Sequence, residues 1–302
     1  MVVHAASELT QLLDAARLAG QTVGLVPTMG ALHAGHRSLV ERAVRECDHV
    51  AVSVFVNPLQ FSDAEDLARY PRTFEADVAV CARAGAATVF APPVTGMYPD
   101  WPAPPATAVT VAGITERWEG ASRPGHFDGV ATAVAKLFAM AGRCRAYFGE
   151  KDFQQLAVVR RMAADLSLPV EVVGCPTVRE PDGLALSSRN ERLSPSERAA
   201  ATVLSRALAT GRRAVAAGED RPAVVAEAMA RLIAGEPAAR LDYAAAVEAA
   251  DLRVPSMLDA PERVRLLVAA QVGPVRLIDN CPALDPCPVL DVFRAPDPAP
   301  GD

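Results

Sequence analysis

The segment VGLVPTMGALHAGH, residues 23–36, predicts the architecture of the chain. Its apolar start, Val23 to Val26, is bounded by turn-forming residues and is typical of a buried strand. A glycine-containing turn follows, and we expect a helix from about Gly35 to Glu46 and a second buried strand from Ala51 to Val56. Two strands joined through a crossover helix lie parallel, so this segment indicates a β-loop-α-β unit of a parallel sheet.

The same alternation continues on both sides of this unit. Leucines at helical spacing predict a helix over residues 7–19, with Ser7 as its N-cap and Gly20 at C′. Further helices are expected near 73–84, 128–141 and 152–165, and further strands at 87–91, 146–148 and 170–174. Residues 92–105 hold six prolines and are expected to be irregular. The alternation favours a Rossmann-like α/β domain with a doubly wound parallel sheet over residues 1–176.

Beyond residue 176 the pattern changes. Ser194-Pro195-Ser196-Glu197 forms a capping box with proline at N1, which predicts an alanine-rich helix to about Ala217, and Pro222 begins another helix. Strands are expected at 241–249, 264–272 and 275–279. We therefore expect a smaller α+β C-terminal domain over residues 177–294 and a disordered tail over 295–302.

Composition excludes several classes of protein. The 302 residues are 51% hydrophobic and 22% charged, which is enough for a substantial core. The net charge of −6 argues against a nucleic-acid backbone as the main partner. No apolar run approaches the ~20 residues of a membrane span. The N-terminus carries Glu8 and Asp14 and no basic region, unlike a secretory signal, so we expect a cytoplasmic protein.

The cysteines and lysines are informative in different ways. The six cysteines form no CxxC pair, so we expect ordinary reduced thiols, without disulfides or a zinc site. Among the 30 basic residues only Lys136 and Lys151 are lysines. A chain that uses arginine almost everywhere is expected to keep lysine where a compact ammonium is needed, although either lysine can be there by chance.

The turn after the first strand of the segment is the strongest candidate site. Its glycines let a ligand approach the backbone at the carboxyl edge of the sheet, and the N-terminus of the next helix favours an anion. His33 and His36 lie three residues apart and can face the same side, where they would donate hydrogen bonds to phosphate oxygens during phosphoryl or nucleotidyl transfer. Ordinary surface or core histidines are the plainer alternative. Zinc binding is disfavoured because no third ligand is evident.

Neutral amides follow the second strand of the unit. Asn57 and Gln60 are expected at the same rim of the sheet as the histidines. Because an amide both donates and accepts hydrogen bonds, the pair suits a hydroxy-acid substrate. Asn-Pro is also a common turn, so this signal is weaker than that of the histidines.

Two further segments can bind phosphate. Gly149 to Gln155 follows a strand and begins a helix, so Lys151 is a candidate phosphate ligand, although Asp152 as an N-cap and Lys151 as a solvated charge are simpler roles. Ser187 and Ser188 precede the fork of Arg189 and form a second candidate clamp. Because this loop lies between the two expected domains, it can close over a nucleotide.

Together these segments resemble the pantoate–β-alanine ligase family, also called pantothenate synthetases. The matching stretches keep the family's order and spacing from residue 27 to 190: PTMGALHAGH, FVNPLQF, RPGHFDGV, YFGEKDFQQL and PTVREPDGLALSSRN. The HxGH motif alone marks only the wider nucleotidyltransferase superfamily, whereas VNPxQF and GEKD-x-QQ narrow the resemblance to the ligase. Leu186 departs from the pattern, since the family commonly has Met there, but both residues are apolar and of similar size.

The resemblance implies a nucleotidyltransferase-type fold and an AMP-forming acid–amino-acid ligase of pantothenate biosynthesis. Pantoate would be activated by ATP as a pantoyl adenylate with release of pyrophosphate, and β-alanine would then displace AMP to give pantothenate. Mg²⁺ would bind through the ATP phosphates, since the sequence offers no cage of protein ligands. The resemblance also implies a homodimer whose ligands are small molecules, with no nucleic-acid or membrane partner.

Roles for individual residues follow from the same resemblance. His36 would act as proton donor or as electrostatic stabiliser of the leaving phosphate. The other residues given a catalytic part are His33, Lys151, Ser187, Ser188 and Arg189. ATP would be held by Met29, Gly30, Ala31, Leu32, His33, Ala34, Gly35, His36, Gly149, Glu150, Lys151, Asp152, Val178, Leu186, Ser187, Ser188 and Arg189. Pantoate and β-alanine would contact Gln60, Gln155 and Asn57, with Arg123 and His126 at the flank.

Three other functions compete with the ligase. Another HxGH nucleotidyltransferase would act on a different small acid or phosphate, but would not require two amide-bearing segments. A non-enzymatic nucleotide-binding module would not need Lys151 together with both histidines. A tRNA synthetase is disfavoured by the net charge of −6 and by the lack of an obvious basic anticodon-binding region.

Overall fold

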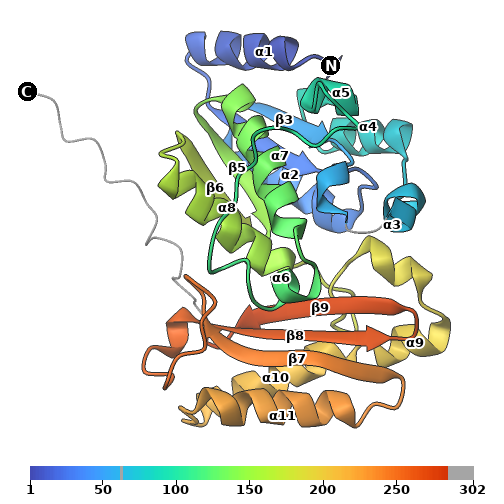
Figure 1. The fold of residues 1–302 in the computed structure, drawn as a ribbon, viewed down its shortest axis with the longest axis vertical. Helices are drawn as coiled ribbons and strands as arrows, with labels where there is room; N and C mark the ends of the chain where they lie inside the picture. Colours follow the sequence, from blue (N-terminus) through green and yellow to red (C-terminus); the bar gives the residue numbers. More distant parts are fainter. Residues whose placement is uncertain (62–63, 285–302) are drawn as a thin grey trace, which may run out of the picture.

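The computed structural model describes residues 1–61 and 64–284, so the tail expected over 295–302 lies outside the described residues. A parallel sheet of six strands occupies the first part of the chain, in the order β1-β4-β3-β2-β5-β6 (Figure 1). Its strands are β1 Val2–Val3, β2 Val23–Thr28, β3 His49–Val54, β4 Thr88–Phe90, β5 Cys144–Gly149 and β6 Val170–Cys175. The expected strands are confirmed, although β3 begins and ends two residues before the predicted 51–56.

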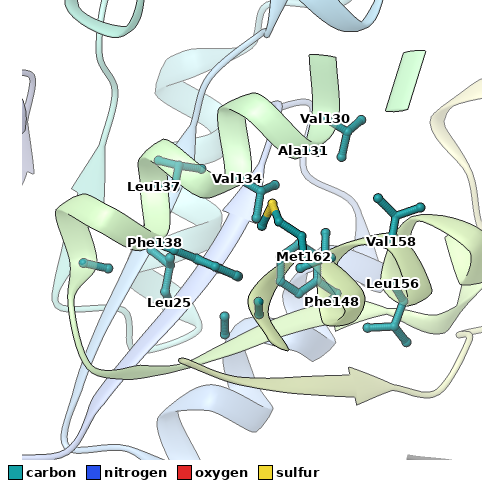
Figure 2. Packing of buried hydrophobic residues seen from close by; sticks show 14 of the residues in the cluster. Leu25, Val130, Ala131, Val134, Leu137, Phe138, Phe148, Leu156, Val158 and Met162 are labelled. Carbon is teal, nitrogen blue, oxygen red and sulfur yellow. The ribbon is translucent and has the colours of Figure 1, made fainter. Parts of the chain in front are cut away.

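Helices cover both faces of this sheet, as a doubly wound fold requires. On one face α1, α7 and α8 share a core with the sheet, in which Leu25, Phe138, Phe148 and Met162 pack together (Figure 2). On the other face α2 and α4 pack against the sheet. Their apolar side chains, among them Val40 of α2, form a separate, smaller core there. The helices of this part are α1 Ala6–Leu18, α2 Ala34–Glu46, α3 Ala64–Arg69, α4 Phe74–Arg83, α5 Val94–Met97, α6 Glu119–Ser122, α7 His126–Ala141 and α8 Phe153–Asp165.

The strand order creates a crevice at one point of the sheet. From β2 the chain winds outward through β3 to β4, and it then returns to place β5 on the other side of β2. Leu25 of β2 pairs with Ala146 of β5, so the two strands end side by side. Ligands of open α/β sheets bind where the winding reverses, outside the carboxyl ends of the strands. The turns after Thr28 and Gly149 are therefore expected to share one site.

A second, antiparallel sheet is formed by β7 Ala239–Glu248, β8 Val264–Val272 and β9 Val275–Pro282. One face packs on α10 Val203–Ala216 and α11 Pro222–Ala234, while the other faces the first part of the chain (Figure 1). Residues such as Val268 belong to the core beneath α10, whereas Val247 and Leu267 join the core of the parallel sheet. Strand β8 is almost entirely buried because it is covered on both faces.

The structure corrects three local expectations. The helix predicted from Pro195 to about Ala217 is two helices, α9 Pro195–Ala200 and α10, because the backbone tightens between them: the N–H groups of Thr202 and Leu204 bond to the carbonyls three residues back, Ala199 and Ala201. Ser7 is not an N-cap, since α1 begins at Ala6 and Glu8 accepts from the backbone N–H groups of His4 and Ala5. The proline-rich stretch 92–105 contains one short helix, α5.

Helix length also bears on membrane association. Among residues 1–61 and 64–284, no helix combines the length and the apolar character needed to cross a membrane.

Candidate active site

A cavity of about 330 Å³ lies between the parallel sheet and the antiparallel sheet. Its walls come from α6, α7, the turn after β5, the loop after β6, and strands β7 to β9. Seven of the residues singled out in the sequence line it: Arg123, His126, Lys151, Asp152, Gln155, Ser187 and Arg189. The cavity therefore collects segments that are far apart in the chain.

The turn between β2 and α2, residues 29–36, is called the histidine turn below. Gly30 and Ala31 both have left-handed backbone conformations, with φ of 85° and 52°. A Cβ at Gly30 would lie 2.9 Å from the carboxylate of Asp77, so glycine is required for close approach as well as for φ. The buried Asp77 carboxylate accepts from the N–H groups of Ala31 (3.1 Å) and Leu32 (2.8 Å). This side chain, from the first turn of α4, fixes the path of the histidine turn.

The two histidines of this turn also cap helix α2. The Nδ1 of His33 accepts from the Gly35 N–H (3.1 Å), and the Nδ1 of His36 accepts from the His33 N–H (3.4 Å). Their ring centroids lie 4.2 Å apart. Because each Nδ1 is an acceptor, each ring carries its proton on Nε2 when neutral.

Burial keeps both rings neutral. It lowers the pKa of His36 to about 4, with the neighbouring His33 adding to the effect. Burial, followed by the positive charge of Lys151, also lowers the pKa of His33. At neutral pH the pair therefore presents two Nε2–H donors to an anion without adding positive charge.

The amide pair after β3 lies on the short helix η1 Pro58–Gln60. Asn57 is buried, and its amide donates to the Gly129 carbonyl (2.9 Å) and to Gln60 Oε1 (3.1 Å), while its Oδ1 accepts from Tyr98 and Leu59. Gln60 Nε2 lies 2.8 Å from the sulfur of Met29 in the histidine turn. Asn57 is thus fully engaged within the protein and holds Gln60 against that turn.

The start of α7 packs tightly on the same short helix. The Nδ1–H of His126 donates to the Gln60 carbonyl (2.8 Å), so its Nε2 accepts from Arg123 Nη1 (3.2 Å). Burial, followed by the Arg123 charge, lowers the pKa of His126 to about 4. A Cβ at Gly129 would overlap the Leu59 carbonyl, which explains the glycine in RPGHFDGV. The His126 side chain therefore faces Arg123 and Gln60 in its neutral form.

The turn after β5 is the one-turn helix η2 Glu150–Asp152, called the lysine turn below. Lys151 Nζ lies 3.7 Å from an Asp152 carboxylate oxygen, and only 17% of the Lys151 side chain is exposed. Although burial opposes the charge on Asp152, Lys151 and Arg189 hold the pKa of Asp152 below its usual value. Both groups line the cavity beside Arg123, so its wall combines several cations with carboxylates, among them Asp152, which stays ionised.

The loop after β6 provides the opposite wall. Leu186 N–H donates to the Val178 carbonyl (2.9 Å), which folds residues 178–186 back on themselves. Ser187 then caps the short helix η3 Ser188–Arg192, and its Oγ accepts from the Arg189 N–H. Ser187 and Arg189 face the cavity. Arg189 is close enough to Arg123 for its charge to add to the effect of burial in lowering the pKa of Arg123.

Comparisons with known proteins agree with this geometry. A family model described as pantoate-beta-alanine ligase matches residues 1–282. The chain is 53% identical to the pantothenate synthetase of Salinispora arenicola (strain CNS-205) over 279 residues, which cover 92% of this chain and 96% of the relative.

The chain belongs to the pantoate–β-alanine ligase family.

Solved structures of pantoate–β-alanine ligases share its fold. The pantothenate synthetase of Thermus thermophilus superposes with a TM-score of 0.85 at 50% identity, covering 93% of this chain and 99% of the other. A pantoate-beta-alanine ligase from Francisella tularensis, solved in complex with beta-gamma ATP and beta-alanine, superposes with a TM-score of 0.75 at 30% identity, covering 94% and 97%. The expected Rossmann-like nucleotidyltransferase fold with a smaller α+β part is confirmed.

Not all predicted site residues of this pantoate–β-alanine ligase face the cavity. Those outside its wall are the histidine turn with Met29 to His36, the amides Asn57 and Gln60, and Gly149, Glu150, Val178, Leu186 and Ser188. The histidine turn is nevertheless close to the lysine turn, because the charges of Lys151 and Asp152 both act on His33 and His36. The two turns follow adjacent strands, β2 and β5, at the same end of the sheet.

Sequence reasoning missed a group of charged residues that connects α6 to the second sheet. Glu119 accepts from both guanidinium nitrogens of Arg276 (2.7 Å each) and from the hydroxyl of Tyr243 (2.9 Å), and Asp242 pairs with the same arginine (2.6 Å). Burial, followed by the Glu119 charge, raises the pKa of Tyr243. The only sequence signal was a glutamate before RPGHFDGV, which identifies no partner.

Sequence reasoning also missed the residues that support the two predicted turns. Asp77 lies in a helix first turn, where an acid is ordinary and gives no sign of its contact with the histidine turn. Asn280 lies in β9 and donates to the Glu150 and Lys151 carbonyls. Both contacts join residues distant in sequence, so spacing could not have revealed them.

Proposed function

We propose that this chain catalyses the ATP-dependent condensation of (R)-pantoate with β-alanine to give pantothenate, AMP and pyrophosphate. The pantoate carboxylate attacks the α-phosphorus of ATP, which forms pantoyl adenylate and releases pyrophosphate. The β-alanine amine then attacks the acyl carbon, the carbon–oxygen bond to AMP breaks, and the amine loses a proton. The observation that carries the proposal is that the neutral histidines follow β2 beside the lysine turn after β5, and that Lys151 and Arg189 line one cavity, in a chain of this family.

Charge that develops on pyrophosphate is the part of the first step that the protein can stabilise directly. We assign the ATP phosphates to Met29–His36, Gly149–Asp152, Val178 and Leu186–Arg189. His33 and His36 act as neutral Nε2–H donors, since a pKa of about 4 leaves His36 without a proton to give at neutral pH. Lys151 and Arg189 supply positive charge, and the Ser187 and Ser188 hydroxyls supply further donors. We therefore assign His36 the role of electrostatic stabiliser; the other possibility, a proton donor, requires the protonated ring.

Gln60 and Gln155 are the proposed ligands of pantoate, with Gln60 also close to β-alanine. Gln155 and the preceding Gln154 both line the cavity, but Gln154 is buried and its amide donates to the Ile114 and Arg117 carbonyls. Asn57 holds Gln60 in place instead of contacting substrate, because its own polar atoms are engaged within the protein. Arg123 and His126 form the flank of the site.

Mg²⁺ is proposed to enter with ATP. Among residues 1–61 and 64–284, no group of three His, Cys, Asp or Glu side chains is arranged to hold a metal ion. The carboxylate of Asp152 in the cavity wall is a suitable oxygen ligand, since its lowered pKa keeps it ionised. These residues fit an ion shared with the substrate, which when bound would neutralise phosphate charge.

Three further proposals concern organisation. We place a domain boundary at 176/177, just after β6 ends at Cys175, with residues 177–294 as a lid-like domain. The resemblance to the family implies a homodimer, which sedimentation equilibrium would test. We also expect the protein in the cytoplasm, and fractionation of cells that produce it would test that location.

Pyrophosphate release tests the proposed reaction. The protein is incubated with ATP, Mg²⁺ and D-pantoate, with and without β-alanine, while AMP and pantothenate are measured. We expect pyrophosphate release to require pantoate, and sustained AMP and pantothenate formation to require β-alanine as well. Release that is independent of pantoate would discard the substrate assignment and leave the alternative of a nucleotidyltransferase acting on another small acid or phosphate.

A further inference from the structure

We propose that Asp279 and Asn280, neighbours on β9, are positioning residues that hold two of the phosphate-binding segments of the first step, the lysine turn and the Ser187–Arg189 segment, in one arrangement. The inference rests on the proposed function, because it concerns how Lys151 and the Ser187–Arg189 segment are aligned for ATP. Both residues are almost completely buried, with 3% and 4% of their surfaces exposed.

Asn280 holds the lysine turn through its backbone. Its Nδ2 donates to the carbonyls of Glu150 (3.0 Å) and Lys151 (2.8 Å). One amide thus satisfies two consecutive carbonyls of a one-turn helix, which has few internal hydrogen bonds of its own. The position of the Lys151 backbone is consequently set by β9 as well as by β5.

Arg265 of β8 holds the side-chain amide of Asn280 in place. Its Nε donates to Asn280 Oδ1 (2.7 Å), and its Nη2 pairs with the Glu150 carboxylate (3.0 Å). The guanidinium carbon lies 4.2 Å from the centroid of the Phe153 ring, at the start of α8. Asn280 is therefore held in one orientation, and the lysine turn is contacted at a carboxylate, two carbonyls and the adjoining ring.

Asp279 holds the second segment. Its carboxylate forms a two-point ion pair with Arg179 (2.7 and 2.9 Å). Arg179 also donates to the Gly183 carbonyl (2.9 Å), so it closes the loop that leads to Ser187 and Arg189. The hydrogen bond from the Leu186 N–H to the Val178 carbonyl joins the two ends of this loop, directly before Ser187.

Strand geometry connects the two supports. Successive side chains of a strand point to opposite faces, so neighbouring residues can reach segments on different sides of the sheet. β9 is paired with β8 along its whole length, from Val275 to Pro282, which makes it a rigid base. The distance between the lysine turn and the loop that carries Ser187 and Arg189 is thereby set by one strand of the second sheet.

This arrangement matters most for the first step. Adenylation needs both phosphate clamps at once, because charge develops on the leaving pyrophosphate. Aminolysis of the adenylate takes place after pyrophosphate has gone, so it depends less on the alignment of the clamps. Loss of the positioning residues should therefore slow adenylation and raise the KM for ATP, with little effect on aminolysis.

The experiment uses Asn280→Ala, Asn280→Asp and Asp279→Asn in the full chain. Both Asn280 variants remove the two donated hydrogen bonds, but only Asn280→Asp adds a charge, and only it keeps an acceptor for Arg265. Adenylation is measured as pyrophosphate release in a single turnover, and aminolysis is measured with supplied pantoyl adenylate and β-alanine. Asp48→Asn is the matched control. Asp48 accepts from Thr22 at the amino ends of β2 and β3, whereas the histidine and lysine turns follow the carboxyl ends of their strands.

We expect adenylation to fall by about 10- to 100-fold in all three variants, with a higher KM for ATP and aminolysis within about twofold of wild type. The control should match wild type in both steps. Adenylation near the wild-type rate in the Asn280 variants would overturn the inference, as would an equal fall in both steps. Loss in Asn280→Asp alone would assign the effect to the added charge and would also overturn it. Failure of the proposed function itself would be visible in wild type, as pyrophosphate release without dependence on pantoate.

Discussion

The histidine turn and the lysine turn end adjacent parallel strands, yet they are supported from different parts of the molecule. The histidine turn is held by its own α/β unit, through Asp77 of α4 and the caps within residues 33–36. The lysine turn is held from the antiparallel sheet, through Arg265 and Asn280. One half of the proposed phosphate site is thus supported from within the parallel-sheet part of the chain, whereas the other half depends on how the second sheet is placed.

The largest effect is expected when either turn loses its phosphate ligand. His36→Ala and Lys151→Ala should each slow single-turnover adenylation by about 10²- to 10³-fold, which corresponds to roughly 2.7–4 kcal/mol of transition-state stabilisation. The two turns should be similar in this respect, because both face the same developing charge. Near-wild-type adenylation in either variant would remove that residue from the catalytic set.

Removal of the support of the histidine turn should have the next largest effect. Asp77→Asn leaves a single amide oxygen where two carboxylate oxygens accept from Ala31 and Leu32, so one N–H would face an NH₂ group. We expect a loss of about 1.5–3 kcal/mol in the free energy of unfolding, measured by urea denaturation, together with slower adenylation. Glu75→Gln, an exposed residue of the same helix turn, is the control. An unchanged stability would show that the turn is held by its own caps alone.

The substrate amides give a smaller and more selective effect. Gln60 contacts the histidine turn and Gln155 follows the lysine turn, so substitutions of the pair test one residue beside each turn. Gln60→Ala and Gln155→Ala should each weaken pantoate binding by about tenfold, since each loses a hydrogen bond of roughly 1–1.5 kcal/mol, while ATP affinity changes little. Isothermal titration with each ligand measures the difference. Equal losses for both ligands would place these residues elsewhere in the site.

The last effect concerns the pH dependence of stability. The folded protein holds His36 and His126 at pKa values of about 4, below the ordinary value near 6.5. Between these values the unfolded chain binds more protons, so stability is complete above pH 6.5 and falls as the pH drops toward 4. Urea denaturation at pH 7.5 and 5.0 should show a smaller drop for His126→Gln than for wild type. Equal drops in the two proteins would mean that His126 is not held neutral by the fold.

The parts of the fold that were predictable share a local cause. The strand–turn–helix at residues 23–46 and the capping box at Ser194 follow from apolar periodicity and turn chemistry within a few residues. The break between α9 and α10 was not predicted, because residues 199–204 are alanines and other residues that are compatible with an unbroken helix, and only the backbone hydrogen bonds of Thr202 and Leu204 mark it. The sequence could not show the contacts of Asn57 either. Its amide suggested a substrate ligand, but in the structure it is bonded to Gly129, Gln60 and Tyr98.

By itself the sequence determined which chemical groups are present and where the chain makes strands, turns and helices, since these depend on neighbouring residues. It indicated two histidines, a rare lysine and an arginine loop as one anion site, because parallel strands end at a common edge. Only the tertiary structure decided that the histidines are buried and that β9 contacts both the lysine turn and Arg179 of the loop after β6. Packing in the folded chain sets the first property, and contacts between residues a hundred or more positions apart set the second. Neither produces a periodic pattern in the sequence.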